Sequence, residues 1–224
     1  EIHAVFHCAA LVNYSLNYDA LRPHNVESTR ALLRFAAAGV RKEFHFVSST
    51  LIFGWTTKTL VMETDDNDDM ANLDFGYAQS KWVSEQLVLA AERQGLAVRI
   101  YRASTISAST GGMGNRDDIV VRLLAFMINH GLAVDAKIQI SFVPADVAAD
   151  SMVAIFRLRH TAGRTLHVTA DSYYNMMDIT SIIARDYGYR FSSHTISEFV
   201  GELNRLCGKD DPLYPLLDFI NRAY

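Results

Sequence analysis

The chain has 224 residues, of which 50% are hydrophobic, 21% are charged and only 4 are proline, a composition typical of a folded domain and not of a disordered segment. Its formal net charge of −4 argues against general nucleic-acid binding, because contact with phosphates requires a basic surface. Two cysteines far apart in sequence exclude a disulfide framework and fit a reduced, cytoplasmic setting, and no apolar run is long enough to span a bilayer.

Predicted strands and helices alternate along the first part of the chain. Residues 4–10 form a short apolar run that ends in small residues, which is typical of a buried strand leading into a tight loop. Residues 21–38 show helical spacing of apolar positions and are followed by Gly39, a common residue just after a helix. Further strands are predicted at 44–49, 96–101 and 138–143, and further helices at 75–93, 117–130 and 145–158.

The last part of the chain continues with a strand at 165–169, a helix at 179–187, a short strand at 189–191 and a helix from Ser197. Strands separated by helices indicate an α/β fold with a parallel sheet covered on both faces. We therefore predict a main domain at residues 1–164 and a small C-terminal α/β subdomain at residues 165–224.

Tyr77 and Lys81 are the strongest candidates for chemistry. They lie four residues apart on the predicted helix 75–93, so they share one face of it. A phenol has a pKa of about 10, and a neighbouring ammonium lowers it toward the range needed for proton exchange at neutral pH. The spacing also arises by chance, so its context matters: strand 44–49 ends in hydroxyl side chains, at the edge where α/β sheets bind ligands. Without Tyr77, the run Ser48-Ser49-Thr50 would be more typical of a turn or a helix cap.

Ser49, Tyr77 and Lys81, with Asn25 on the preceding helix, resemble the active site of the short-chain dehydrogenase/reductase superfamily, and most closely that of its extended branch. We prefer Ser49 to Thr50 for the hydroxyl role, because Ser49 stands five residues before a glycine, as the hydroxyl does in related extended members.

Further segments extend this resemblance over nearly the whole chain. Those similar to extended-branch motifs are 7–10, 25–29, 47–54 and 101–103. Within them Ser28, Phe53 and Ala103 replace the usual glycine, tyrosine and proline. Those similar to thioester reductase domains, the terminal domains of nonribosomal peptide and polyketide synthases that are related to carboxylic acid reductases, are Asn13, 76–85, 142–148 and 211–217. The resemblance implies a Rossmann-like, doubly wound parallel sheet with a substrate-side C-terminal subdomain.

The resemblance also implies an activity. NADPH would supply hydride to an acyl or peptidyl thioester on a phosphopantetheinyl carrier domain of a larger multidomain synthase, and the product would leave as an aldehyde or alcohol. Tyr77 would donate the proton, Ser49 would hold the same carbonyl oxygen, and Lys81 would lower the pKa of Tyr77 and bind the nicotinamide ribose. Asn25 would position Lys81 through a water. The residues implied to line the cofactor, mostly through backbone atoms, are Ala9, Ala10, Ala103, Ser104 and Ile106.

One departure from the superfamily is the absence of its glycine-rich nucleotide loop. The cluster at 111–114 is followed by Asp117 and Asp118, which would repel a phosphate, so we expect a substrate-side lid or a plain linker there. We expect residues 4–10 to be the fourth strand of a dinucleotide fold whose first part is missing, and the chain alone not to hold its cofactor. Two alternatives stay open: a docking or non-redox cyclising module without dinucleotide, and another extended-branch enzyme acting on acyl-CoA or nucleotide sugars.

No metal site is expected. His3 and His7 have the spacing of a zinc pair, but on a strand four residues span roughly 13 Å, too far for one ion. We interpret His7 and His45 as core or loop-ordering residues, and Cys8 as a small buried residue.

Two other groups have simple structural interpretations. The run Asp65-Asp66-Asn67-Asp68-Asp69 lacks the glycine and distal glutamate of a calcium loop, so we expect a solvated acidic loop. Five aromatic residues near the C-terminus could line a substrate cleft, but core of the subdomain is the preferred interpretation: Tyr173, Tyr174, Tyr187, Tyr189 and Phe191.

Overall fold

A computed structural model describes residues 2–54, 56, 58–67, 70–137 and 139–223. The chain forms two compact units. Unit 1 comprises Glu1–Ile106 and Val143–Thr169, and unit 2 comprises Ser107–Phe142 and Ala170–Tyr224. The chain therefore passes between the units three times. The domain boundary after residue 164, which was predicted from the sequence, stays a prediction.

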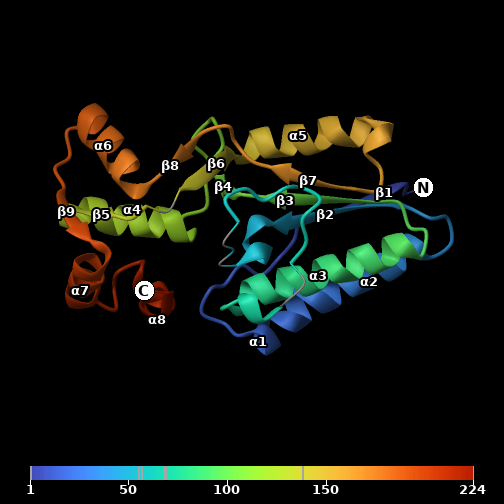
Figure 1. Cartoon of the computed structure of the whole chain (residues 1–224), viewed down its shortest axis with the longest axis horizontal. Helices are drawn as coiled ribbons and strands as arrows, with labels where there is room; N and C mark the ends of the chain where they lie inside the picture. Colours follow the sequence, from blue (N-terminus) through green and yellow to red (C-terminus); the bar gives the residue numbers. More distant parts are fainter. Residues whose placement is uncertain (1, 55, 57, 68–69, 138, 224) are drawn as a thin grey trace. The chain divides into compact units, whose positions relative to one another are not determined.

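Unit 1 is built on a four-stranded parallel sheet of order β1-β2-β3-β7 (Figure 1). Its strands are β1 (Ala4–His7), β2 (Glu43–Ser49), β3 (Val98–Ala103) and β7 (Arg164–Val168). The predicted α/β class with a parallel sheet is confirmed. β7 belongs to this sheet and pairs along β3, although the sequence analysis grouped it with the C-terminal subdomain.

Helices cover both faces of this sheet (Figure 1). On one face lie α2 (Ser28–Ala37) and α3 (Gly76–Arg93), and α5 (Ala145–Arg157) lies on the other. Side chains alternate accordingly along β2: Phe44 and Phe46 enter the core under α2 and α3, whereas His45 contacts Phe156 of α5. The core under α2 and α3 consists of Leu33, Ala36, Phe44, Phe46, Val88, Leu96, Val98 and Ile100.

Short helices join these elements in unit 1. The segment before α2 contains α1 (Tyr18–Arg22) and a π-helical turn, η1 (Pro23–Glu27), so helix formation is continuous but irregular there. β2 leads directly into a 3₁₀ helix. The 3₁₀ helices are η2 (Thr50–Phe53), η3 (Met70–Asn72) and η4 (Arg159–Thr161).

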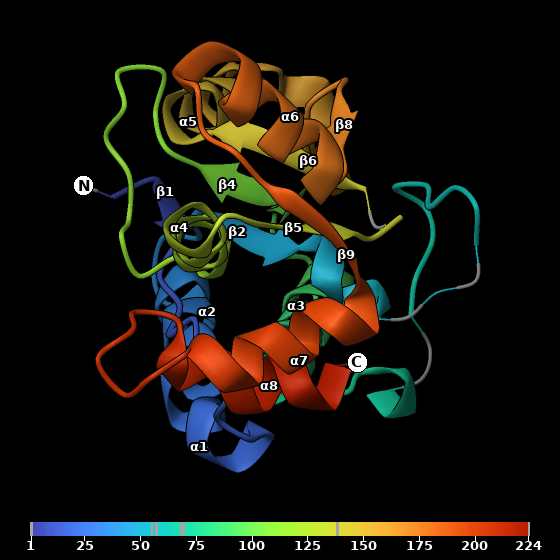
Figure 2. The same cartoon turned by 90° about the vertical axis from the view of Figure 1, so that its left-hand side faces the viewer.

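Unit 2 is built around a two-stranded parallel pair, β5 (Leu132–Asp135) and β9 (Ser192–Thr195). α4 (Ile119–His130), α6 (Met176–Tyr187) and α7 (Ile196–Leu206) pack against β5 (Figure 2). The remaining elements carry the chain between the units or end it: β4 (Thr105–Ser107), β6 (Ile140–Pro144), β8 (Tyr173–Tyr174), η5 (Tyr214–Leu216) and α8 (Leu217–Ala223).

Several predictions for unit 2 were wrong in detail. The strand predicted at 189–191 forms instead at β9, and the strand β5 was not predicted. α6 starts at Met176 because Asn175 and Asp178 form a capping box. The tyrosines expected in the core are exposed, by 54% for Tyr173 and 75% for Tyr187.

The glycine cluster at 111–114 forms a hydrogen-bonded turn. The Ser109 amide donates to the Met113 carbonyl at 2.8 Å, and the Gly112 amide donates to the Ser109 carbonyl at 2.8 Å. Just after it, Asp118 caps α4 and accepts hydrogen bonds from the first amides of the helix. A carboxylate therefore occupies the helix end where a phosphate would otherwise be attracted.

Within the described residues, no helix is long and apolar enough to cross a membrane, and no group of three or more His, Cys, Asp or Glu side chains is arranged to hold a metal ion.

Candidate active site

The candidate residues of unit 1 gather at the carboxyl edge of its sheet. Because the strands are parallel, β1, β2, β3 and β7 all end at this edge. Ser49 is the last residue of β2, in register with Ala103 at the end of β3, and Ala103 is in register with Val168. Ala9 and Ala10 follow the end of β1.

Ser49 is buried and held by its own backbone turn. Its hydroxyl accepts a hydrogen bond from the Leu51 amide at 3.2 Å, which caps η2. The turn ends at Gly54, where φ is 54° and an added Cβ would lie 2.1 Å from the carbonyl oxygen of Asn72. Glycine is therefore required at this position, and the close approach fixes where the chain leaves the active-site edge.

Helix α3 begins against the segment that follows β1. A Cβ added to Gly76 would lie 2.4 Å from the Asn17 carbonyl carbon and 2.5 Å from the Leu16 oxygen, so the two backbones touch. The next residue, Tyr77, places its ring 5.7 Å from the ring of Tyr14. This contact sets the start of α3 and hence the position of Tyr77.

Burial raises the pKa of Tyr77 to about 12, because the phenolate loses solvation. This shift is opposite to the predicted one, in which Lys81 lowers the pKa of Tyr77. In this structure Tyr77 is thus a neutral phenol at pH 7 that holds its proton.

Lys81 is 4% exposed and points to β2. Its Nζ donates to the Val47 carbonyl at 2.6 Å and lies 4.2 Å from the centroid of the Phe46 ring. Burial lowers the pKa of Lys81 to about 8, and the charges of Glu85 and Cys8 oppose this shift. The side chain is therefore mostly an ammonium ion at pH 7, within two strand residues of Ser49.

Asn25 lies in the π-helical turn η1 and is buried. Its side-chain amide accepts from the Leu11 amide at 2.8 Å and donates to the Leu11 carbonyl at 3.1 Å and to Ser80 Oγ at 2.9 Å. These contacts link the segment after β1 to α3. The direct partners of the Asn25 side chain are thus Leu11 and Ser80, whereas the expectation from the sequence was a water-mediated link to Lys81.

The predicted cofactor-lining residues differ in exposure. Ala9 is exposed and Ala10 is half-buried, so the backbone after β1 can be approached closely. Ala103 is buried, and the Ser104 amide donates to the Val168 carbonyl at 3.1 Å. Ile106 lies in β4 and is 41% exposed. The first four lie at or just beyond the carboxyl edge, and Ile106 is further along the chain.

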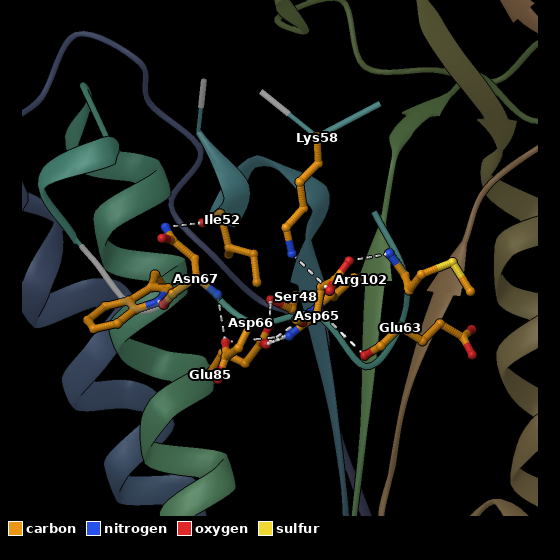
Figure 3. Close-up of polar contacts among 11 residues, drawn as sticks. Ser48, Ile52, Lys58, Glu63, Asp65, Asp66, Asn67, Glu85 and Arg102 are labelled. Carbon is orange, nitrogen blue, oxygen red and sulfur yellow. Dashed lines mark hydrogen bonds and ion pairs between the residues drawn. The ribbon is translucent and has the colours of Figure 1, made fainter. Parts of the chain in front are cut away.

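A buried ion pair that was not predicted from the sequence joins α3 to β3 (Figure 3). Glu85 and Arg102 are 0% and 2% exposed, and Arg102 donates to Glu85 Oε1 from Nε at 3.0 Å and from Nη2 at 2.7 Å. Ser48 Oγ donates to Glu85 Oε2. The available signal was the pair of arginines, Arg99 and Arg102, inside the predicted strand, because a buried arginine requires a partner.

The acidic segment after β2 keeps the side chains of Asp65 and Asp66 accessible to solvent, as predicted, but its backbone is anchored by Arg102 (Figure 3). Arg102 Nη1 donates to the Asp65 carbonyl at 2.6 Å. Asn67 is buried; its Nδ2 donates to the Ile52 carbonyl at 2.7 Å, and its own carbonyl accepts from Trp82 Nε1 at 2.6 Å. Asp68 and Asp69 lie outside the described residues.

The two histidines are buried, as predicted. His7 Nε2 lies 2.9 Å from Thr29 Oγ1, and His45 Nδ1 lies 3.0 Å from the Tyr101 hydroxyl. Burial lowers the pKa of each to about 4. The prediction for Cys8 was wrong, because this residue is exposed.

Comparison with known proteins places this arrangement in a family. Residues 1–152 match the NAD-binding family described as Male sterility protein. The chain belongs to this family. One relative is a linear gramicidin synthase subunit of Brevibacillus parabrevis, which is 30% identical over 203 residues. The match covers 89% of this chain and 4% of that protein. The L-2-aminoadipate reductase large subunit of Eremothecium gossypii is 32% identical over 96% of the chain and 17% of that protein.

Solved structures agree with this membership. The terminal R domain from the myxalamid PKS-NRPS biosynthetic pathway has a TM-score of 0.90 and 30% identity, covering 96% of this chain and 55% of that one. UDP-glucuronic acid 4-epimerase from Bacillus cereus, with a TM-score of 0.72 and 18% identity, shares the fold. The resemblance to extended short-chain dehydrogenase/reductases and thioester reductase domains is thus confirmed, and the chain spans only part of the length of these relatives.

Proposed function

We propose that this chain carries the catalytic residues of an NADPH-dependent reductase that releases an acyl or peptidyl thioester from a phosphopantetheinyl carrier domain, as an aldehyde or an alcohol. The similarity to synthases, to aminoadipate reductase and to a terminal R domain supports this activity and a place within a larger synthase. The same proposal assigns substrate binding to the predicted C-terminal subdomain, residues 165–224, without the part of β7 that belongs to the main sheet.

The observation that carries the proposal is the docking of α3 on β2. The hydrogen bond from Lys81 Nζ to the Val47 carbonyl brings this helix to the strand that ends in Ser49. Tyr77 lies one turn before Lys81, toward the carboxyl edge of the sheet. A hydroxyl, a phenol and an ammonium are thus supplied by two elements in contact.

The residues at this edge fit a nicotinamide dinucleotide. Ala9 and Ala10 leave the backbone after β1 approachable, and Lys81 interacts electrostatically with Cys8, which directly precedes Ala9. Lys81 would hold the ribose hydroxyls, because an ammonium has three donors and its bond to Val47 uses one. The bound cofactor would supply the hydride. The choice of NADPH over NADH follows the resemblance to thioester reductase domains.

The chain's own groups would bind and polarise the thioester carbonyl. Tyr77 holds its proton at neutral pH and would donate it toward the carbonyl oxygen as negative charge develops there. Ser49 accepts one hydrogen bond from Leu51 and can donate its own proton to the same oxygen. Two donors aimed at one oxygen form an oxyanion site, in which each donor contributes roughly 10²–10³-fold to the rate.

The test is to incubate the protein that contains this chain with one acyl group presented on a carrier domain or on coenzyme A, and with NADPH or NADH. We expect aldehyde or alcohol to form fastest from the carrier-bound thioester with NADPH, as measured by mass spectrometry of the product. Turnover of a nucleotide sugar in place of either thioester, or product formation that does not depend on a nicotinamide cofactor, would refute the proposed function.

A further inference from the structure

Lys81 and Glu85 occupy successive turns of α3 and dock on successive residues of β2. Lys81 Nζ donates to the Val47 carbonyl, and Ser48 Oγ donates to the carboxylate of Glu85. Residues four apart lie on the same helix face, so the carboxylate and the ammonium belong to one buried cluster.

Arg102 of β3 pairs with Glu85 inside the protein. Ser48 and Arg102 are in register on neighbouring strands, so both reach Glu85 from the sheet. Arg102 makes two charge-assisted hydrogen bonds to Glu85 Oε1, and Ser48 satisfies Oε2 (Figure 3). Both carboxylate oxygens of Glu85 therefore have hydrogen-bond donors from the sheet.

The groups that surround the Lys81 ammonium come from several elements. His7 and Cys8, at the end of β1, interact electrostatically with it, and Phe46 of β2 presents its ring. The pKa of His7 is about 4, so this side chain is neutral at pH 7. Glu85 contributes the carboxylate that counteracts the burial of the ammonium.

We propose that Glu85, hydrogen-bonded to Ser48 and paired with Arg102, is a positioning residue: it anchors α3 on β2 and β3, holds Lys81 one turn earlier against the Val47 carbonyl, and favours the ammonium form of that lysine. The use of that charge in catalysis rests on the proposed function, whereas the state of Lys81 does not. Arg102 also anchors the Asp65 carbonyl, so the same pair ties the segment after Ser49 to α3.

The decisive experiment is an NMR titration of isotope-labelled lysine side chains in the intact chain, with Lys81→Arg to assign the signal. In the wild type, Lys81 should titrate at about pH 8. In Glu85→Gln the midpoint should move to lower pH, because the carboxylate that favours the ammonium is gone. Glu92→Gln makes the same change further along α3 and should leave the midpoint in place. An unchanged midpoint in Glu85→Gln, or an equal shift in Glu92→Gln, would overturn the proposal.

A second variant is needed if Glu85→Gln, which leaves Arg102 buried without its partner, fails to fold. Circular dichroism would detect this failure. Glu85→Gln/Arg102→Gln removes both charges and leaves no unpaired buried ion. It should again lower the midpoint of Lys81, whereas Arg102→Lys, which keeps Glu85 and an oppositely charged partner, should leave the midpoint near the wild-type value. A wild-type midpoint in the double variant would contradict the proposal.

The reductase assay separates this inference from the function it rests on. In Glu85→Gln the falling limb of the kcat–pH profile should move to lower pH with the Lys81 midpoint. A shifted titration with an unshifted profile would overturn a role of this charge in catalysis. If wild-type protein reduces no thioester, the proposed function fails, and the titration still decides the state of Lys81.

Discussion

The two compact units bury polar groups very differently. Of the 16 polar or charged side chains buried among the described residues, 14 belong to unit 1, and those of unit 2 are Ser141 and Thr180. Unit 1 buries complete ionic groups, including Lys81, Glu85 and Arg102, whereas unit 2 leaves large aromatic side chains such as Tyr187 exposed. Buried ionisable groups are costly and concentrate where a protein does chemistry, so the difference supports the proposal that unit 1 carries the catalytic residues.

The largest effect is expected when one partner of a buried ion pair in unit 1 is removed. Arg102→Met leaves the Glu85 carboxylate buried without its partner, and we expect the free energy of unfolding to fall by about 3–5 kcal/mol in urea denaturation. The matched control in unit 2 is Arg185→Met, which removes the exposed pair with Asp186 and should leave stability unchanged within error. Similar losses in both variants would contradict the comparison.

Ser48 and Ser49 separate a structural from a catalytic role within unit 1. Ser49→Ala should lower kcat by roughly 10²–10³-fold, because it removes an oxyanion donor, and should reduce stability by only about 0.5–1 kcal/mol, because the Leu51 amide loses its cap. Ser48→Ala should instead reduce stability by about 1–3 kcal/mol, because Glu85 loses a buried donor. Steady-state kinetics and denaturation of both variants test this. If Ser48→Ala lost the activity and Ser49→Ala kept it, Ser49 would not be the hydroxyl of the site.

The burial of His45 predicts a pH dependence of stability. The folded-state pKa is about 4 and the ordinary value is 6.5, so between these values the unfolded state binds a proton that the folded state does not. The contribution is complete above about pH 6.5 and is lost as pH falls toward about 4, by up to about 3 kcal/mol. His45→Phe should make denaturation midpoints less sensitive to pH in this range. An unchanged pH slope would show that His45 is not the group responsible.

The smallest expected changes in stability come from substituting two glycines that have a positive φ. Gly54→Ala in unit 1 meets the Asn72 carbonyl oxygen and should cost at least about 2 kcal/mol. Gly112→Ala in unit 2 has no neighbouring atom within 4 Å, so it should cost only about 1 kcal/mol from its φ of 81°. Equal thermal stabilities of the two variants would contradict the tight packing at the exit from Ser49.

The sequence predicted those parts of the molecule that depend on local patterns. β2 and β3 were predicted because they are short runs rich in aromatic and β-branched residues, and Tyr77 and Lys81 because their spacing places them on one helix face. β9, with the sequence Ser-Ser-His-Thr, was misplaced because it is polar and forms only by pairing with the distant β5.

The missed features of the site depend on long-range contacts. Glu85 and Arg102 are 17 residues apart and meet only when α3 packs on β3. Asn25 contacts Ser80, 55 residues away, so its partners could not be inferred from spacing. The pKa of Tyr77 depends on burial, and the sequence analysis considered only the neighbouring charge.

The most direct test of the account is single-turnover reduction of a carrier-bound acyl thioester by Tyr77→Phe protein. The control, Tyr187→Phe, makes the same change at a residue of unit 2 that is 75% exposed. We predict that Tyr77→Phe abolishes reduction while Tyr187→Phe keeps the wild-type rate. Undiminished reduction by folded Tyr77→Phe protein would contradict the assignment of the proton donor and of the site built around it.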